Sequence, residues 1–442
     1  MSSPNLSGKV FLVVALACLL AVPCVADSQA RVVRLSVVDG DVLIDRNTGQ
    51  GYEKAFLNLP VTEGVKIKTG RDGRAELEFE DASTLRMTPN SVIDVPELWL
   101  RDSGAKVSTV HLQEGAAYVS FLAAKGDEFN LTFAREKLTL TRPAHVRIEM
   151  GDTDATVAVF KGDVEVAGPS GTVEVGKNQT ASFDLLDNER SKLARSVAES
   201  PFDSWDKQQS QYQQRYSASN YSSYSPYAYG TNDLSYYGNF FSAPGYGMLW
   251  QPYFAGAGWD PYMNGAWAFY PGFGYGWVSA YPWGWTPYHY GSWVYVPLYG
   301  WAWQPGGAWM GWNTVPVVVN APAAFIAPHS PGLPGQRILP VNRGPAIAVM
   351  GRSVGKVGIP NNSAGLGIPR GSVRNLSQLS QTAEQRGFAT TRINSAPAAV
   401  SSGSRGGHAA PSPRAAPAWH GSSSMSTSSG HSGVSRSSPV HR

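Results

Sequence analysis

The chain has 442 residues, only 16 % of them charged, and 36 basic against 33 acidic side chains give a formal net charge of +3. This balance excludes a chain that is basic throughout, as polycationic nucleic-acid binders are. The charge is unevenly placed, because residues 337–442 carry a net charge of +11 and residues 1–336 a net charge of −8. The sequence therefore describes an acidic body followed by a basic C-terminal segment.

Residues 1–30 have the pattern of an export signal. Lys9 precedes the apolar run 10–22, and small residues follow it, which is the order of regions in a cleavable secretory leader. Cleavage is predicted after Ala26 or Ala30. The apolar run is shorter than the roughly 20 residues that span a bilayer. We therefore expect a periplasmic or secreted protein with no stable membrane span after cleavage.

Both cysteines of the chain, Cys18 and Cys24, lie inside this leader. Small residues before Cys18 leave lipidation as one alternative to cleavage, and a leader retained as an anchor is another. The cleaved protein would contain no thiol, which excludes disulfides, zinc–thiolate sites and cysteine nucleophiles. We expect no cofactor and no metal site.

Residues 31–186 repeat short runs in which apolar and polar side chains alternate, the pattern of half-buried strands. Turn sequences such as Asp39-Gly40 separate the runs. The predicted fold is mainly β, either an antiparallel β-sandwich or a coil of short strands. In residues 74–80 the apolar side chains alternate with charged ones, and the carboxylates on the second face are predicted to be solvated: Glu76, Glu78 and Glu80.

The stretch EGVKIKTGRDGRAELEFEDASTLRMTPNS at 63–91 resembles the signature of FecR-type periplasmic domains, although Ala82 stands where these usually have Gly. Residues 157–166 and 173–183 resemble the strand pairs that close such domains. Proteins similar to FecR regulate a sigma factor through a cytoplasmic arm, one membrane helix and a periplasmic sensing domain. Here the arm would be residues 1–9 alone. The resemblance therefore implies a periplasmic β module that contacts a partner.

Residues 187–233 are predicted to hold a short helix and a linker. Ser200 and Pro201 form a typical helix start, with Asp203 three residues after the cap. A stripe at helical spacing is expected to pack on a neighbouring domain: Phe202, Trp205, Gln209, Tyr212 and Tyr216. Residues 217–233 are the predicted linker.

Residues 234–313 predict a second, small, Trp-rich β domain. Between 234 and 336 the only charged side chain is Asp260. Tryptophans recur about every eight residues, which is typical of short strands joined by tight turns: Trp250, Trp259, Trp267, Trp277, Trp285, Trp293, Trp301 and Trp309. The run WGWTPYHYGSW at 283–293 resembles an uncharacterised Trp/Tyr/Gly-rich domain found behind FecR-like modules in exported bacterial proteins. This resemblance implies architecture and no activity.

The aromatic array offers candidate ligand contacts, because exposed aromatic faces stack on sugar rings. The candidate ligand-binding residues are Trp259, Asp260, Tyr262, Trp267, Trp285, Tyr288, His289, Tyr290 and Trp293. The alternative, which is favoured for most of the tryptophans, is that the rings form the core of a unit with few aliphatic side chains. Asp260 is then expected to cap its Trp-Asp-Pro turn.

Residues 314–442, rich in Pro, Ala, Gly, Ser and Arg, are predicted to be a disordered tail, because such a composition buries little apolar surface. Its positive charge could bind anionic envelope polymers or the acidic body. The arginines are too widely spaced for a nucleic-acid site, so no nucleic-acid partner is expected.

No catalytic residue is predicted, because the common catalytic motifs are missing from the sequence. The favoured function is a non-enzymatic exported envelope protein, a binding or scaffolding module that contacts a cell-wall glycan or a protein partner. One alternative is a periplasmic FecR-like sensor or regulator held by an uncleaved leader. Another is a glycan-acting enzyme that uses Asp260 with a carboxylate of the body. The sequence leaves the oligomeric state open.

Overall fold

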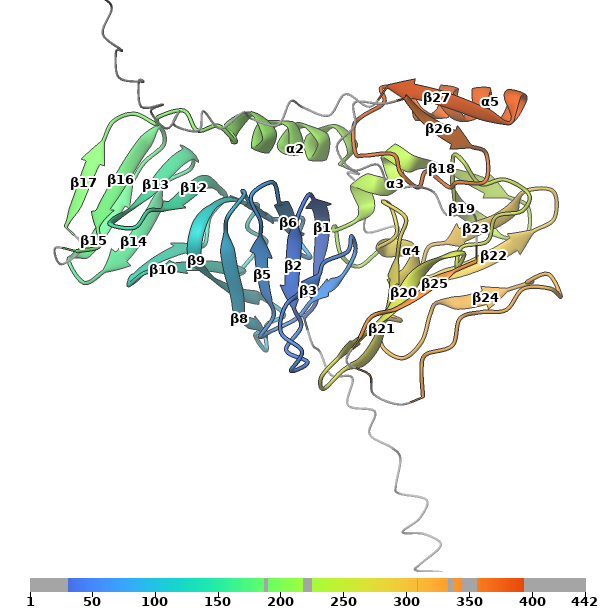
Figure 1. The fold of residues 1–442 in the computed structure, drawn as a ribbon, viewed down its shortest axis with the longest axis horizontal. Helices are drawn as coiled ribbons and strands as arrows, with labels where there is room; N and C mark the ends of the chain where they lie inside the picture. The colour runs from blue at the N-terminus through green and yellow to red at the C-terminus, as the bar shows by residue number, and fades with distance from the viewer. Residues whose placement is uncertain are drawn as a thin grey trace, which may run out of the picture. The chain divides into compact units, whose positions relative to one another are not determined.

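The structure is a computed structural model that describes residues 31–186, 190–217, 225–307, 309–332, 335, 337–343 and 356–392 (Figure 1). The predicted leader, with Ala26 and Ala30, and residues 393–442 lie outside the described residues. Strands hold 45 % of the residues and helices 11 %, which confirms the mainly-β prediction. No helix in the described part of the chain is long and apolar enough to span a bilayer.

The N-terminal half is a β-sandwich of two sheets that share one strand. Its first sheet, sheet A, has the order β4 (Pro60–Val61), β1 (Val33–Asp39), β6 (Arg74–Glu78), β7 (Thr84–Met87), β9 (Lys106–Phe121), β12 (Ala144–Met150), β13 (Asp154–Lys161), β16 (Gln179–Asp184) and β17 (Ser191–Ala194). Neighbouring strands of sheet A are antiparallel.

The second sheet, sheet B, has the order β3 (Glu53–Lys54), β2 (Val42–Asp45), β5 (Lys66–Thr69), β8 (Val92–Leu100), β9, β10 (Glu128–Phe133), β11 (Glu136–Leu140), β14 (Val164–Gly168) and β15 (Gly171–Val175). These pairs are antiparallel except β9 with β10, which run parallel. The antiparallel sandwich predicted from the sequence is thus present with one parallel pair.

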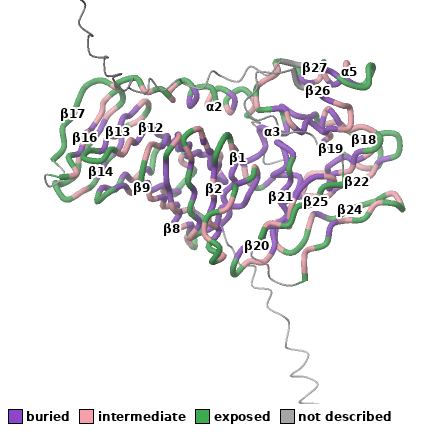
Figure 2. Tube along the Cα trace, viewed as in Figure 1, coloured by how far each residue is buried: buried purple, intermediate pink, exposed green. Residues whose placement is uncertain are grey.

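Strand β9 turns the corner between the two sheets. Its first half, through Leu112, pairs with β8 and β10, whereas its second half, from Gly115 on, pairs with β7 and β12. Gly115 has φ +79°, and a Cβ there would meet Asn90 O at 2.5 Å, so only glycine fits this corner. The inner faces of both sheets form one aliphatic core, which Figure 2 shows as buried strands.

Helix α2 (Asp203–Tyr216) lies on the outer face of sheet A (Figure 1). It begins two residues later than predicted, with Phe202 and not Ser200 at the N-cap, and the Asp203 carboxylate accepts a hydrogen bond from the Ser200 N–H at 2.9 Å. Trp205 and Tyr212 of the predicted stripe are buried. The expected packing of this face against its neighbours is therefore confirmed.

The C-terminal half, here called the aromatic domain, begins with α3 (Thr231–Tyr237) inside the predicted linker. A sheet called sheet C follows, with the order β18 (Gly238–Ala243), β19 (Gly247–Pro252), β23 (Gly300–Gln304), β22 (Ser292–Val296) and β24 (Val317–Val319). The other strands and helices are β21 (Gly274–Ser279), β20 (Asn264–Tyr270) and β25 (Leu339–Asn342), which form a sheet in that order, and the one-turn helix α4 (Thr286–His289).

The tryptophan period does mark short hairpins. Trp267 is the register partner of Trp277, and Trp303 is the register partner of both Trp250 and Trp293. Their indole rings converge on one aromatic core. The run at 283–293 is not a continuous strand, because Trp285 is the N-cap of α4 and Pro287 lies in its first turn.

The prediction of disorder from residue 314 is wrong for the described part of that segment. Strands β24 and β25 extend the two sheets of the aromatic domain, and residues 356–392 form β26 (Lys356–Pro360), α5 (Leu376–Arg386) and β27 (Phe388–Arg392). Ile359, Ile368 and Leu376 are buried against the aromatic core. This sparse set of apolar side chains suffices because the aromatic domain supplies the surface that they cover.

Candidate functional site

The aromatic residues predicted to contact a ligand lie in the core. Their exposed fractions are 3 % or less: Trp259, Tyr262, Trp267, Trp285, Tyr288, His289, Tyr290 and Trp293. Tyr288 stacks on the ring of Trp283, and the ring of Trp293 lies tilted against it, 6.0 Å away. The arrangement therefore matches the alternative reading, in which the rings hold the domain together and present no open face for a sugar.

Asp260 is the one partly exposed residue of the predicted ligand set. Its Oδ1 accepts a hydrogen bond from the Tyr262 N–H at 2.8 Å, so it caps the turn as expected. Burial raises the pKa of Asp260, and the Tyr262 N–H opposes this shift.

The three carboxylates predicted to be solvated on β6 and beyond are instead buried. Glu76, Glu78 and Glu80 have exposed fractions of 0, 1 and 4 %. The alternation of this strand is as predicted, but α2, α3 and the chain around residue 228 cover its second face, and arginines meet each carboxylate there. Arg31 binds Glu80 with two hydrogen bonds of 2.7 and 2.8 Å.

Two of these arginines come from strands that flank β6. Arg34 on β1 is the register partner of Glu78, and its Nη1 lies 3.0 Å from Glu78 Oε2. Arg86 on β7 is the register partner of Glu76, and its Nε lies 2.7 Å from Glu76 Oε2. Cross-strand neighbours on one face lie close enough to pair in this way.

The network then reaches α2 through Arg86. Its Nη1 lies 2.6 Å from Oδ1 of Asp206, whose Oδ2 lies 2.9 Å from Nε2 of His145 on β12. The same guanidinium donates to Ser210 at 2.8 Å and to Gln213 at 3.0 Å. Arg86 therefore holds α2 at three positions, and Arg147 of β12, which lies 2.7 Å from Asp203, holds its first turn.

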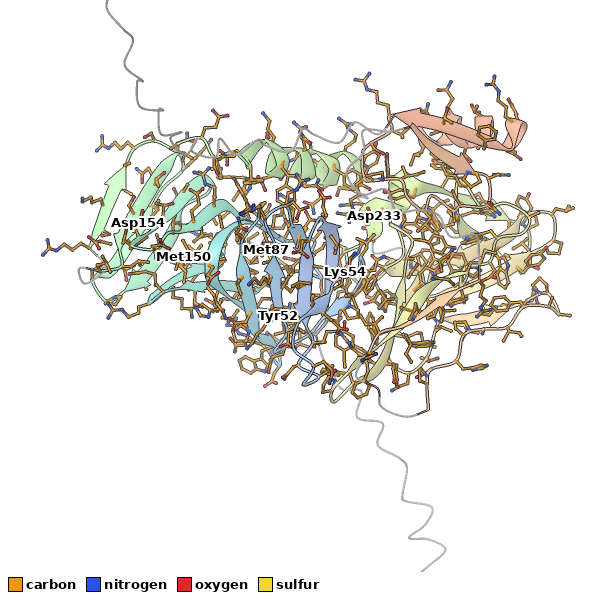
Figure 3. All side chains as sticks on the ribbon, in the orientation of Figure 1. Tyr52, Lys54, Met87, Met150, Asp154 and Asp233 are labelled. Carbon is orange, nitrogen blue, oxygen red and sulfur yellow. The ribbon has the colours of Figure 1, made fainter. Side chains whose placement is uncertain are left out.

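The network also reaches α3 and the C-terminal segment. Asp233 of α3, labelled in Figure 3, is fully buried, and its Oδ2 lies 2.7 Å from Arg34 Nη1. Arg370 binds the same carboxylate with two hydrogen bonds of 2.9 Å and donates to Glu76 Oε1 at 3.0 Å. The three parts of the chain thus share one buried cluster of charges, here called the charge network: Arg34, Glu76, Glu78, Arg86, Asp206, Asp233 and Arg370.

The charge network holds three arginines against four carboxylates, so its acids exceed its bases by one. Burial would raise the pKa of Glu76 and Asp233, but the arginines beside them hold both pKa values below the usual range. At Glu78 burial outweighs its arginines, and the pKa is raised.

Comparison with known proteins assigns families to both halves. Residues 65–165 match the family model described as FecR protein, and residues 231–328 match a family of unknown function, DUF6600. The chain carries a FecR domain and a DUF6600 domain. The FecR match falls in the sandwich, from β5 to β14, and the DUF6600 match falls in the aromatic domain.

Solved structures add little to this assignment. Two crystal structures of a protein from Parabacteroides distasonis, provisionally described as an anti-sigma factor, are 16 % identical over 30 % of this chain and 60 % of theirs, with a TM-score of 0.27. The chain thus spans about 60 % of that protein's length, and a likeness this low carries no argument. No curated protein matches the chain.

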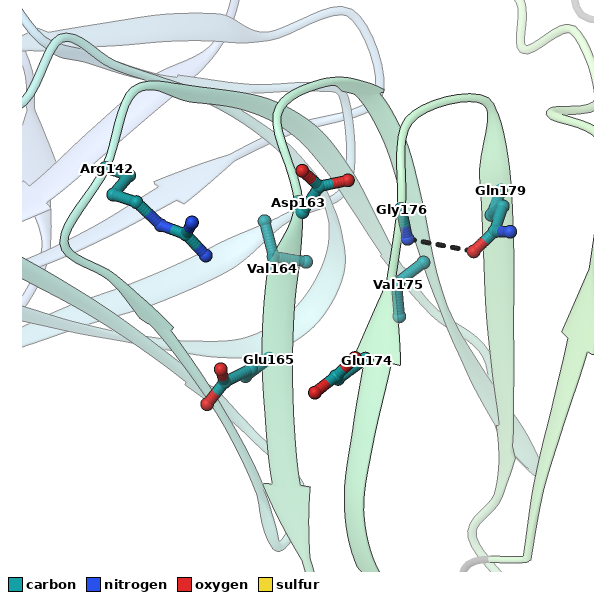
Figure 4. A pocket seen from close by; sticks show the side chains of 8 residues that line it. All are labelled: Arg142, Asp163, Val164, Glu165, Glu174, Val175, Gly176 and Gln179. Atoms are coloured by element: carbon teal, nitrogen blue, oxygen red, sulfur yellow. Dashed lines mark hydrogen bonds between the residues drawn. The ribbon is translucent and has the colours of Figure 1, made fainter.

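Two surface hollows lie on the FecR domain. One of about 390 Å³ follows α2 and is lined by His145 and Phe160 together with polar side chains of the helix. The other, of about 310 Å³, lies at β14 and β15, where Glu165 and Glu174 face each other across the strands (Figure 4). In the described part of the chain, no three His, Cys, Asp or Glu side chains are grouped so that they could hold a metal ion.

His289 is a buried titratable group in the DUF6600 domain. Its ring stacks on Trp309, with centroids 4.6 Å apart, and its Nδ1 lies 2.9 Å from the Trp285 carbonyl oxygen. Burial lowers the pKa of His289 to about 4. The folded protein therefore keeps this imidazole neutral at pH values where an unfolded chain protonates it.

We expect stability to fall as the pH drops from about 6.5 to about 4, because the unfolded state alone binds a proton at His289 in this window. The contribution is fully present above about pH 6.5, and its loss amounts to about 3 kcal/mol at most. The free energy of unfolding in urea, measured across this range, should decline less steeply in a His289→Gln protein. Equal slopes in the two proteins would contradict the prediction.

Proposed function

We propose that this chain is a non-enzymatic exported protein of the cell envelope, in which the FecR domain binds a protein partner and the DUF6600 domain acts as its fixed scaffold. The FecR match supports a regulatory or sensing role for this module. The proposal rests on one observation: other parts of the chain cover the outer face of sheet A, but not to the same extent the outer face of sheet B. The outer face of sheet A is occupied by α2, α3 and Arg370, which leaves the outer face of sheet B as the candidate docking surface.

The polar side chains on the outer face of sheet B are held in place by one another. Thr109 donates to Glu97 at 2.7 Å, and Thr139 donates to the side-chain oxygen of Asn130 at 2.9 Å. Beside them Trp99 is 57 % exposed. Ordered polar groups around an exposed indole resemble the composition of a protein interface, where aromatic anchors contribute most of the affinity.

The distribution of charge on this face favours a protein over a glycan. Lys54, Lys66 and Lys68 are exposed at one end of sheet B, on β3 and β5, whereas Glu165 and Glu174 are exposed at the other end, on β15 and its neighbour β14. A surface with charges of both signs at fixed positions selects a partner with the complementary arrangement. A neutral or uniformly charged polymer offers no such arrangement.

Photo-crosslinking from the full-length protein in its own cells tests this function. A crosslinking amino acid at Trp99 or Lys137, on the outer face of sheet B, should give protein adducts of discrete mass. The same group at Leu193, exposed on β17 of sheet A, is the control and should not. The adducts should disappear with Lys66→Glu and Lys68→Glu. Sedimentation with cell-wall sacculi, with no protein adduct at either position, would overturn the proposal and favour the glycan.

A further inference from the structure

Arg370 lies outside both family matches, and yet its side chain completes a site built by the two matched domains. Its guanidinium meets Asp233 through Nε and Nη2, and Glu76 through Nη1. It also lies over the ring of Tyr212 in α2, 5.4 Å from the centroid. The side chain is 11 % exposed, so the site opens to the surface at the position of this residue.

This combination of groups is specific for a guanidinium. The two hydrogen bonds to Asp233 are parallel and use the planar fork of the arginine, which a lysine ammonium cannot reproduce. The aromatic ring of Tyr212 adds a cation–π contact on the flat face of the group. We call this site the arginine cage; it consists of the carboxylates of Asp233 and Glu76 and the ring face of Tyr212.

The acceptors of the arginine cage are held by groups other than Arg370. Asp233 is fixed by Arg34 at 2.7 Å and by the Tyr212 hydroxyl at 2.8 Å. Glu76 is fixed by Arg86 at 2.7 Å and by the Ser36 hydroxyl at 2.7 Å. The cage is therefore positioned by the FecR domain, α2 and α3, and Arg370 is its occupant.

Arg370 lies in a surface turn. Pro369 and Gly371 on either side of it are exposed, and the turn is closed by the Ser372 N–H and hydroxyl, which both donate to the Pro369 carbonyl. The chain on either side of the turn is held independently, because the Tyr237 hydroxyl donates to the Ile368 carbonyl at 2.7 Å and the Val373 N–H donates to the Tyr236 hydroxyl at 3.0 Å. Without Arg370 the charge network would hold two arginines against four carboxylates, which favours the entry of another cation.

We propose that the arginine cage is a guanidinium-binding site that Arg370 occupies in cis and that an arginine side chain of a partner polypeptide can occupy in its place. The choice of a partner polypeptide as the source of the second arginine rests on the proposed function. The guanidinium site itself rests only on the contacts described above. When one arginine replaces the other, the buried carboxylates are paired both before and after the exchange. If Arg370 left and nothing replaced it, these carboxylates would be left unpaired.

Chemical rescue of an Arg370→Ala protein tests the site. We expect the full chain with this substitution to melt at a lower temperature and to regain stability in low-millimolar guanidinium or an arginine-containing tripeptide. The matching lysine tripeptide and sodium chloride at equal ionic strength should not restore it. An Arg374→Ala protein, which loses an exposed arginine of the same segment, is the control and should respond to none of them.

Competition in cis gives the second readout. A fluorescent arginine tripeptide should bind the Arg370→Ala protein at least about tenfold more tightly than the unsubstituted protein, whose own arginine fills the cage. If the Ala variant does not fold, Arg370→Lys keeps the charge without the fork and should show the same guanidinium response.

Equal rescue by lysine and arginine, or no difference in peptide binding, would overturn the guanidinium site. An intact site together with no protein adduct at sheet B would contradict the proposed function alone.

Discussion

A Glu76→Ala protein is expected to lose about 3–5 kcal/mol of its free energy of unfolding, because the change removes one partner from a buried ion pair and leaves the others unpaired. Glu76 has no exposed surface and receives Arg86, Arg370 and the Ser36 hydroxyl. Alanine would leave both guanidinium groups without this acceptor in a largely buried site. Urea denaturation followed by circular dichroism measures the loss.

Glu165→Ala is the matched control for this substitution. Glu165 also lies on a strand in an alternating stretch, but it is exposed and faces Glu174 directly. Like charges opposite each other are unfavourable, so its removal should change the free energy of unfolding by no more than about 0.5 kcal/mol, or raise it slightly. Similar losses in the two proteins would show that Glu76 is solvated, as the sequence alone predicted.

The contrast between Glu76 and Glu165 explains what the sequence could predict in the FecR domain. Alternation determines which side chains share a face, so the strands and the sandwich were predictable. It does not determine what covers that face. Asp206, Asp233 and Arg370 lie 130 to 294 residues from Glu76 along the chain. A signal was nevertheless present, because Arg34 and Arg86 occupy the same phase of the strands that flank β6.

The DUF6600 domain shows the same limit for aromatic side chains. The eight-residue period predicted part of the hairpins correctly, because period and turn chemistry are local, whereas Trp259, Trp285 and Trp309 lie outside the strands. Whether Tyr288 or Trp293 faces a ligand or the core depends on the neighbours that fold against it. Residues 356–392 were predicted to be disordered for a related reason, because their few apolar side chains, such as Ile359 and Leu376, become useful only against an aromatic surface built elsewhere.

The second large effect is expected for Trp283→Ala, with a loss of about 3–5 kcal/mol of the free energy of unfolding. Trp283 is fully buried, and its ring lies 4.9 Å from that of Trp250 and 5.0 Å from that of Tyr281. Its Nε1–H donates to the Ala364 carbonyl at 2.7 Å, so the substitution also leaves an unpaired acceptor in the core.

Trp99→Ala is the matched control, because it removes an indole that is 57 % exposed and should cost about 0.5 kcal/mol or less of the free energy of unfolding.

The shape of the unfolding transition of the Trp283→Ala protein tests whether the two domains behave as one body. Asp233 lies within the DUF6600 match and Arg34 lies on β1 of the sandwich, before the FecR match begins, and they pair at 2.7 Å in a buried site. If the DUF6600 domain unfolded first, this arginine would lose that carboxylate, which is costly for a buried charge. A single transition that shifts as a whole is therefore expected by near-ultraviolet and far-ultraviolet circular dichroism. Two transitions, with only one displaced, would show that the charge network does not couple the domains.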